Sequence, residues 1–300
     1  QHTDKYCLMP NTYKTIKAAC VIIGDEVLNG KITDTNSKFF SKYCYGLGIK
    51  LTEICIIGDE PEHILSTCKR LSTCNDFIVT TGSTGPTPDD VAYDCLSKIY
   101  DDTPLKLSKT CVDRMERINA PTKRFSGQAL QDHYRMATLP SGPNTSEDYP
   151  IEASWVPVAG IHNQIFIFPG IPQLFEKMIT GMTDKFKKIY NLKENHYKRY
   201  YIKTKYGESS MSRFLRELQD KATKVSPEVK IGSYPHWGMG FNTISVLGLE
   251  GHDELLQQLK SEVIAKLEGE EITEEEEQSY SEKRIEKETD DGYKVVKDSV

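Results

Sequence analysis

The chain has 300 residues, of which 38% are hydrophobic and 27% charged, and its formal net charge is −6. This composition is ordinary for a soluble protein with a large domain and a smaller one. No run approaches 18 apolar residues and no basic stripe is present, which argues against a membrane span and a nucleic-acid-binding surface.

The first half of the chain alternates between two hydrophobic periodicities. After an irregular segment at 1–15, strands are predicted at 17–23, 50–57 and 76–81, and helices at 36–47, 61–71 and 91–100. This alternation predicts an α/β domain with a doubly wound, mostly parallel sheet, spanning 16–192. Further on we expect a helix at 126–135, a hairpin-like strand pair at 153–158 and 164–168, and one long amphipathic helix at 171–190.

A second unit is predicted over residues 193–268. Strands at 197–205, 229–233 and 243–249, with helices at 210–222 and 253–267, favour a small α+β domain of ferredoxin-like or KH-like type. Residues 266–300 carry 13 acidic and 6 basic side chains. We therefore expect 269–300 to be a disordered acidic tail or a lone solvated helix. Eight scattered cysteines without a Cys-x-x-Cys pair favour reduced thiols and a cytoplasmic location.

Two loops point to a ligand site. Residues 82–90 (Gly-Ser-Thr-Gly-Pro-Thr-Pro-Asp-Asp) run from the end of a predicted strand to the start of a helix, which is where open α/β sheets bind ligands. Glycines there let backbone N–H groups approach an anion. Residues 24–36 (Gly-Asp-Glu-Val-Leu-Asn-Gly-Lys-Ile-Thr-Asp-Thr-Asn) follow another buried strand. Either loop taken alone would also fit a tight turn that binds nothing.

Together the two loops resemble the molybdopterin-binding (MogA/MoaB-like) superfamily, and within it CinA-type proteins and the N-terminal domain of eukaryotic FAD synthases. Residues 168–172 (Phe-Pro-Gly-Ile-Pro) and 232–238 (Gly-Ser-Tyr-Pro-His-Trp-Gly) extend the resemblance over most of 15–265. Two positions depart from the family pattern. Ser83 stands where a second glycine is usual, and Ala92 where a threonine commonly follows the acidic pair.

Carboxylates cluster on these loops, at one edge of the predicted sheet. Hard oxygen ligands suit Mg²⁺, Mn²⁺ or Co²⁺, which would bridge a pyrophosphate, and a further carboxylate would activate water. We assign catalysis to Asp25, Glu26, Asp34 and Asp90, and the metal to Asp25, Asp34, Asp89 and Asp90. The alternative is that Asp89 is a helix N-cap and that Asp25 and Glu26 favour a helix terminus.

The remaining site assignments concern the substrate. The residues assigned to substrate or phosphate binding on the loops are Gly24, Gly30, Lys31, Asn36, Thr81, Gly82, Ser83, Thr84, Gly85, Pro86, Thr87, Pro169 and Gly170. Lys31 would offset phosphate charge, or is simply solvated. Tyr234 and Trp237 would stack on a flavin or purine ring, or are core aromatics of the small domain.

Three functions stay open. The resemblance implies a metal-dependent pyrophosphatase that cleaves FAD to FMN and AMP, with ADP-ribose-like compounds as further substrates. Molybdopterin adenylyl transfer and a non-catalytic binding module are the alternatives. No stretch resembles a synthase domain, so FAD synthesis is not implied. The resemblance and the apolar-faced helix at 171–190 also imply a homo-oligomer, most simply a dimer.

Overall fold

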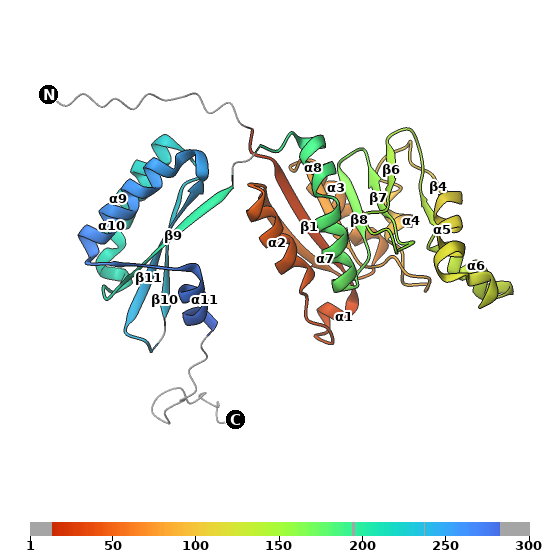
Figure 1. The fold of residues 1–300 in the computed structure, drawn as a ribbon, viewed down its shortest axis with the longest axis horizontal. Coiled ribbons are helices and arrows are strands. Elements are labelled where there is room, and N and C mark those ends of the chain that lie inside the picture. Colours follow the sequence, from red (N-terminus) through yellow and green to blue (C-terminus); the bar gives the residue numbers. More distant parts are fainter. Residues whose placement is uncertain (1–13, 194–195, 237, 283–300) are drawn as a thin grey trace, which may run out of the picture. The chain divides into compact units, whose positions relative to one another are not determined.

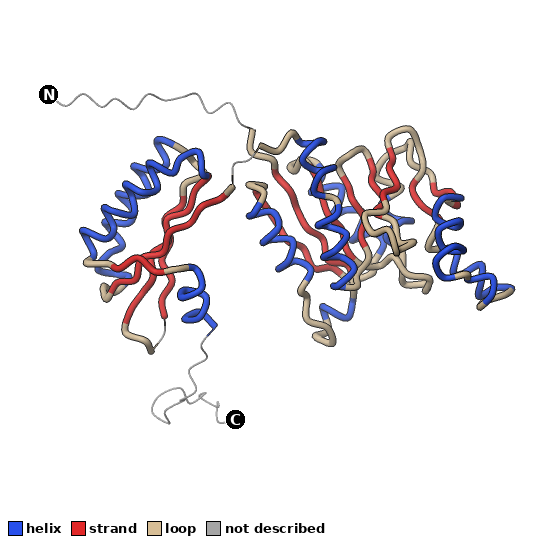
Figure 2. The backbone as a smooth tube through the Cα atoms, in the orientation of Figure 1, coloured by secondary structure: helices blue, strands red, loops and turns tan. Residues whose placement is uncertain are grey.

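The computed structural model describes residues 14–193, 196–236 and 238–282. These residues form two compact units, with the first ending at 193 and the second beginning at 196. Each unit is described by itself (Figures 1 and 2).

The first unit is built on a six-stranded sheet. Its order is β2 (Lys50–Ile57), β1 (Lys17–Ile23), β3 (Phe77–Thr81), β8 (Ile165–Phe168), β7 (Val158–Ile161) and β6 (Thr145–Asp148). The four strands from β2 to β8 are parallel, and β7 and β6 are antiparallel to their neighbours. A separate antiparallel pair joins β4 (Leu105–Leu107) to β5 (Thr138–Pro140). The predicted mostly parallel α/β sheet is confirmed.

Helices cover both faces of this sheet. They are α1 (Asp25–Leu28), α2 (Asn36–Gly46), α3 (Pro61–Ser72), α4 (Ala92–Leu96), α5 (Lys109–Asn119), α6 (Gly127–Arg135), α7 (Pro172–Gly181) and α8 (Thr183–Tyr190), with a 3₁₀ turn at Pro121–Lys123. Successive residues of β1 alternate between two cores: Val21 packs with α3 and α4, and Ile22 with α2 and α7. Because both faces are covered, β1 is apolar from Ala18 to Ile23.

Two expectations for this unit are wrong. The helix predicted at 171–190 is two helices that meet at Met182, and Gly181 beside the break packs so closely that a Cβ there would lie 2.6 Å from Pro150. Residues 153–157 form no strand. Arg114 donates to the carbonyls of residues 151, 152 and 154 (3.3, 3.1 and 2.8 Å). A side chain, and not a neighbouring strand, therefore satisfies these backbone groups.

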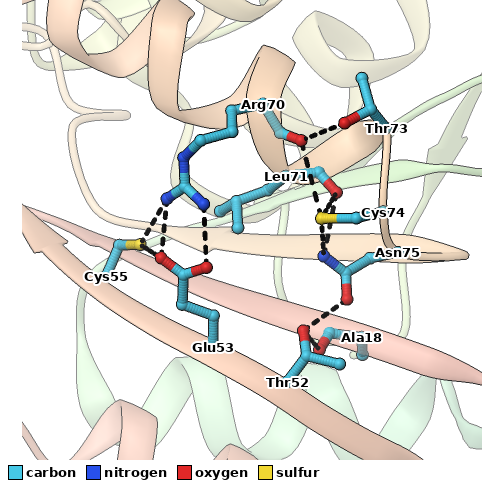
Figure 3. Close-up of polar contacts among 9 residues, drawn as sticks. All are labelled: Ala18, Thr52, Glu53, Cys55, Arg70, Leu71, Thr73, Cys74 and Asn75. Carbon is cyan, nitrogen blue, oxygen red and sulfur yellow. Dashed lines mark hydrogen bonds and ion pairs between the residues drawn. The ribbon is translucent and has the colours of Figure 1, made fainter.

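Polar side chains fasten α3 to the edge strand β2 (Figure 3). The Arg70 guanidinium donates to both carboxylate oxygens of Glu53, at 2.9 and 2.7 Å. At the adjacent residue of the strand, the Thr52 hydroxyl donates to the Asn75 side chain (2.6 Å). The Asn75 amide in turn donates to the Leu71 carbonyl (2.9 Å). The helix is thereby attached to the edge strand at two places.

The second unit has the element order β-α-β-β-α-β. Its elements are β9 (Tyr197–Thr204), α9 (Glu208–Val225), β10 (Lys230–His236), β11 (Phe241–Leu249), a 3₁₀ turn at Glu250–His252, α10 (Asp253–Leu267), β12 (Glu270–Ile272) and α11 (Glu274–Glu282). The antiparallel sheet runs β10-β11-β9-β12, and α9 and α10 pack on its apolar face. This is the ferredoxin-like alternative of the two predicted.

Residues 269–300 were expected to be disordered or a lone solvated helix; over 270–282 they form a strand and a helix that both contact the rest of the second unit. Strand β12 pairs antiparallel with β9, and Ile272 is buried there. In α11, Glu277 is only 5% exposed and lies 3.1 Å from the His236 ring. Pairing and burial of a few residues therefore outweigh an acidic composition. Residues 283–300 lie outside the described part of the chain.

Two further properties concern the described residues alone. Their seven cysteines are all free thiols. None of their helices combines the length and the apolar character needed to cross a lipid bilayer.

Candidate functional site

A cavity of ≈ 530 Å³ lies where the loops after β1, β3 and β8 meet. Because these three strands are parallel, the loops after them share one edge of the sheet. The predicted site residues that line the cavity are Gly24, Glu26, Asp34, Asn36, Thr81, Gly82, Ser83, Thr84, Gly85, Asp90, Pro169 and Gly170. The lining does not include Asp25, Gly30, Lys31, Pro86, Thr87 or Asp89.

The loop after β3 is shaped by its first two residues. Gly82 has a φ of +102°, and a Cβ there would lie 2.1 Å from the Ile23 carbonyl oxygen, so no side chain fits. Ser83 also has a positive φ, of 56°. Its hydroxyl donates to the Asp89 carbonyl (3.1 Å) and accepts from the Val91 N–H (3.0 Å). These bonds offset the strain at a position where the family usually has glycine.

The Asp90 carboxylate is held at the cavity by its own loop. Its Oδ2 accepts from the backbone N–H and the hydroxyl of Thr87, at 2.9 and 2.5 Å. Gly85 makes room for it, because a Cβ there would lie 2.5 Å from the same oxygen. Thr87 therefore contributes by orienting Asp90. Asp89 is exposed, and the Thr87 hydroxyl is the main cause that lowers the pKa of its carboxyl.

The carboxylates of the loop after β1 point in different directions. Glu26 and Asp34 line the cavity, and Asp34 also caps α2 by accepting from the backbone N–H (3.0 Å) and the hydroxyl of Ser37. Asp25 turns toward β2 instead, where a Cβ on Gly58 would lie 2.3 Å from its Oδ1. Lys31 is exposed. The structure thus separates Asp25 from the other predicted catalytic carboxylates.

These positions bear directly on the predicted metal. Within 14–193, 196–236 and 238–282, no three His, Cys, Asp or Glu side chains are grouped so that they could hold an ion, so the four predicted ligands are not assembled. Mg²⁺ usually binds through one or two carboxylates together with substrate phosphates. Asp34 and Asp90 fit that mode, since both line the cavity. The donor set suits a cation that arrives with its substrate.

An aromatic and apolar wall completes the cavity, and the sequence did not predict it. Tyr93, Met136, Trp155 and Leu174 contribute to it. Burial raises the pKa of the Tyr93 hydroxyl well above its usual value, so Tyr93 is a neutral phenol. The predicted ring-stacking residue Tyr234 belongs to the second unit, where it is 38% exposed, and Trp237 lies outside the described residues.

Arg135 at the end of α6 is a further residue that the sequence did not predict. It donates to the Thr87 carbonyl (2.7 Å) and to the Asp90 carbonyl (2.9 Å), which are the two ends of the turn that carries Asp90. A small cavity of ≈ 50 Å³ is lined by Arg135 together with Ser83, Thr84 and Gly85. No motif around Arg135 indicated this role in the sequence.

The sequence itself matches a known family model. Residues 19–188 match the model described as "probable molybdopterin binding domain". The chain belongs to this family. The match covers the first unit almost entirely, and it confirms the resemblance drawn from the two loops.

The chain is also similar to individual known proteins. The chain is 30% identical over 232 residues to a probable FAD synthase of Caenorhabditis elegans, covering 73% of this chain and 43% of that protein. It is 28% identical over 161 residues to a CinA-like protein of Myxococcus xanthus, covering 53% and 37%. The chain thus spans less than half the length of these relatives. A solved CinA structure from Thermoplasma acidophilum aligns with a TM-score of 0.49 at 20% identity, covering 56% of this chain and 98% of that one.

Proposed function

We propose that the first unit binds a nucleotide containing a pyrophosphate, such as FAD, and hydrolyses it to FMN and AMP. The observation that carries this proposal is that one cavity combines an aromatic wall with a glycine-containing loop and three carboxylates. The wall suits a heterocyclic ring, and the loop suits the phosphates. A volume of ≈ 530 Å³ lies within the range typical of small-ligand sites.

The charges of the lining support a metal requirement. Glu26, Asp34 and Asp90 line the cavity, and no Lys, Arg or His is among the described residues that do so. A pyrophosphate entering alone would meet three negative side chains and no positive one among the described lining residues. A divalent cation such as Mg²⁺, Mn²⁺ or Co²⁺, when bound, would neutralise charge on the pyrophosphate and on the leaving phosphate. Asp34 and Asp90 would hold it, which leaves Glu26 to accept a proton from the attacking water.

The family supports one competing function in the same cavity. A pterin nucleotide would use the same aromatic wall and the same loop, either for adenylyl transfer or for binding without catalysis. The two ideas differ in the product. Hydrolysis of FAD yields FMN and AMP, whereas transfer leaves AMP on a second molecule.

The deciding experiment incubates the purified chain with FAD, ADP-ribose or adenylylated molybdopterin, each with Mg²⁺, Mn²⁺, Co²⁺ or EDTA. Chromatography follows the products and calorimetry follows binding. We expect FMN and AMP from FAD in a metal-dependent reaction. Binding of FAD without turnover would support a binding module, and absence of both would remove the proposal. A homo-oligomer stays a prediction, and light scattering that gives the monomer mass would overturn it.

A further inference from the structure

Asn36 is a buried polar residue of the cavity wall. It is the first residue of α2, it lines the cavity, and it is only 5% exposed. The side-chain amide donates to the Thr81 hydroxyl oxygen (2.9 Å) and to the Gly170 carbonyl (3.0 Å). One amide group therefore connects the start of α2 with the ends of β3 and β8.

The network determines which way this amide points. The Gly170 carbonyl can only accept, so exchanging the amide nitrogen and oxygen would bring two acceptors within 3.0 Å of each other. The Thr81 hydroxyl already gives its proton to the Pro169 carbonyl, at 2.8 Å, and can only accept from Asn36. Both contacts require the nitrogen where it is. The position of Oδ1 follows from the hydrogen bonds themselves.

This oxygen has no partner. Asn36 Oδ1 is buried and accepts no hydrogen bond from any residue that the structure describes. Buried polar atoms in folded proteins are nearly always paired, and an unpaired one calls for an explanation. Here the explanation is at hand, since the residue borders a cavity large enough for a ligand.

We infer that Asn36 Oδ1 accepts a hydrogen bond from the ligand and thereby selects ligands that carry a donor at that place. This inference rests on the proposed function and names the chemistry that the site reads. A phosphate oxygen is itself an acceptor and would be repelled. Of the two roles predicted for Asn36 from the sequence, substrate or phosphate binding, we therefore retain contact with another part of the substrate. The ligand contributes either a ring N–H of its heterocycle or a sugar hydroxyl.

The test compares FAD with analogues that each lack one donor. Suitable probes are FAD methylated at the flavin N3, FAD carrying N6,N6-dimethyladenine, and FAD with a deoxyribose, all titrated in Mg²⁺ by flavin fluorescence. A buried acceptor that loses its donor weakens binding of the analogue, relative to FAD, by about tenfold to a hundredfold. We expect one analogue to bind the wild type at least tenfold more weakly than FAD, and its identity separates ring N–H from hydroxyl.

Variants assign the penalty to Asn36. In Asn36→Ala the weak analogue and FAD should bind equally, because the acceptor is gone. Asn29→Ala is the matched control: it removes an amide from the same loop outside the cavity lining, and should keep the full penalty. If Asn36→Ala does not fold in a thermal melt, Asn36→Leu replaces it, since leucine is close to asparagine in size and has no acceptor.

The outcomes are distinct. Equal binding of all analogues to the wild type would overturn the inference and show that water satisfies the oxygen, while leaving the proposed function intact. A penalty that persists in Asn36→Ala would also overturn it. A wild type that binds no FAD would remove the inference together with the proposed function.

Discussion

Each of the two units buries a polar group beside its sheet, but only one of these groups is left without a partner. In the second unit, His236 Nε2 lies 2.9 Å from the Thr243 hydroxyl and 3.1 Å from the carboxylate of Glu277, a buried residue of α11. In the first unit, Asn36 borders a cavity, and its buried Oδ1 has no partner among the described residues. The paired group has the character of a structural element, and the unpaired one has that of a binding site.

The same contrast holds for the carboxylates of the first unit. Asp90 is supported by Thr87, Gly85 and Arg135 and lines the cavity, whereas Asp25 is turned toward Gly58. From the sequence the two residues were equivalent candidates. In the structure only Asp90 is held where a ligand would meet it.

Replacing Asp90 and Asp25 one at a time tests this difference, and the rate loss at Asp90 is the largest effect that we expect. Asp90→Ala should lower the rate of FAD hydrolysis about a hundredfold, because losing one stabilising interaction of about 3 kcal/mol in the transition state has that effect. Asp25→Ala should stay within a few-fold of the wild type. Initial rates across metal concentrations, beside thermal melts, provide the measurement. If both variants fold and lose activity equally, lining the cavity does not distinguish the active carboxylates from the others.

The paired group of the second unit gives the next largest effect. Glu277→Ala leaves His236 with the Thr243 hydroxyl as its one hydrogen-bond partner among the described residues, and should lower the free energy of unfolding by about 2 kcal/mol. Glu275→Ala, an exposed glutamate on the same helix, should change it by less than about 0.5 kcal/mol. Urea denaturation measures both. If the two variants unfold alike, α11 contributes no stability, and the acidic segment is the dispensable tail that the sequence suggested.

Arg135 connects α6 to the loop that carries Asp90, and its removal should have a smaller effect. Without the two hydrogen bonds to the carbonyls of Thr87 and Asp90, the turn is no longer fixed by α6. We therefore expect kcat/KM for FAD to fall about tenfold, equivalent to about 1.4 kcal/mol. Added guanidinium should restore part of the activity of Arg135→Ala, and Arg135→Lys should keep part of it.

The control is Arg117→Ala, which removes an exposed arginine of α5. It should leave kcat/KM unchanged. A stability loss in Arg135→Ala without an activity loss at a temperature where the variant is folded would show that Arg135 serves the fold alone.

The strand-loop-helix pattern of the first unit could be predicted because its signals are local. The apolar run at 17–23 and the helical spacing at 61–71 each specify an element, and glycine-containing loops after buried strands specify the site edge. Signals that depend on distant partners were missed. Trp155 reaches the cavity, and Arg135 the turn that carries Asp90, from segments without a motif. The direction of Asp25 depends on Gly58 in another loop.

Composition misled at the other end of the chain for the same reason. Glu270–Ile272 is acidic, yet its backbone pairs with β9, and Glu277 is buried because His236 lies opposite. Neither contact can be seen from the local sequence. The unpaired oxygen of Asn36 is the extreme case, since its meaning depends on hydrogen bonds to residues 81 and 170.

A third arrangement, paired but exposed, should give the smallest effect. Arg70 and Glu53 form a two-fold hydrogen-bonded ion pair on the surface, with 54% and 41% of their side chains exposed (Figure 3). The Arg70 guanidinium is the main cause that lowers the pKa of Glu53 from 4.5 to about 2. A carboxyl whose pKa is lower in the folded state stabilises the fold above its unfolded pKa, and this contribution disappears as the pH falls through the folded one.

Glu53→Gln should therefore be less stable than the wild type at pH 6, by under about 1 kcal/mol, because water and salt screen exposed pairs. The difference should shrink between pH 4.5 and pH 2 and should also shrink in high salt. Urea denaturation across this pH range measures it, with Glu62→Gln as control, which alters an exposed glutamate of α3, the helix that carries Arg70. A difference that stays constant down to pH 2 would mean that Glu53 acts through packing and not through its charge. In that case the Arg70–Glu53 pair would have a structural role, as the His236 contacts of the second unit do.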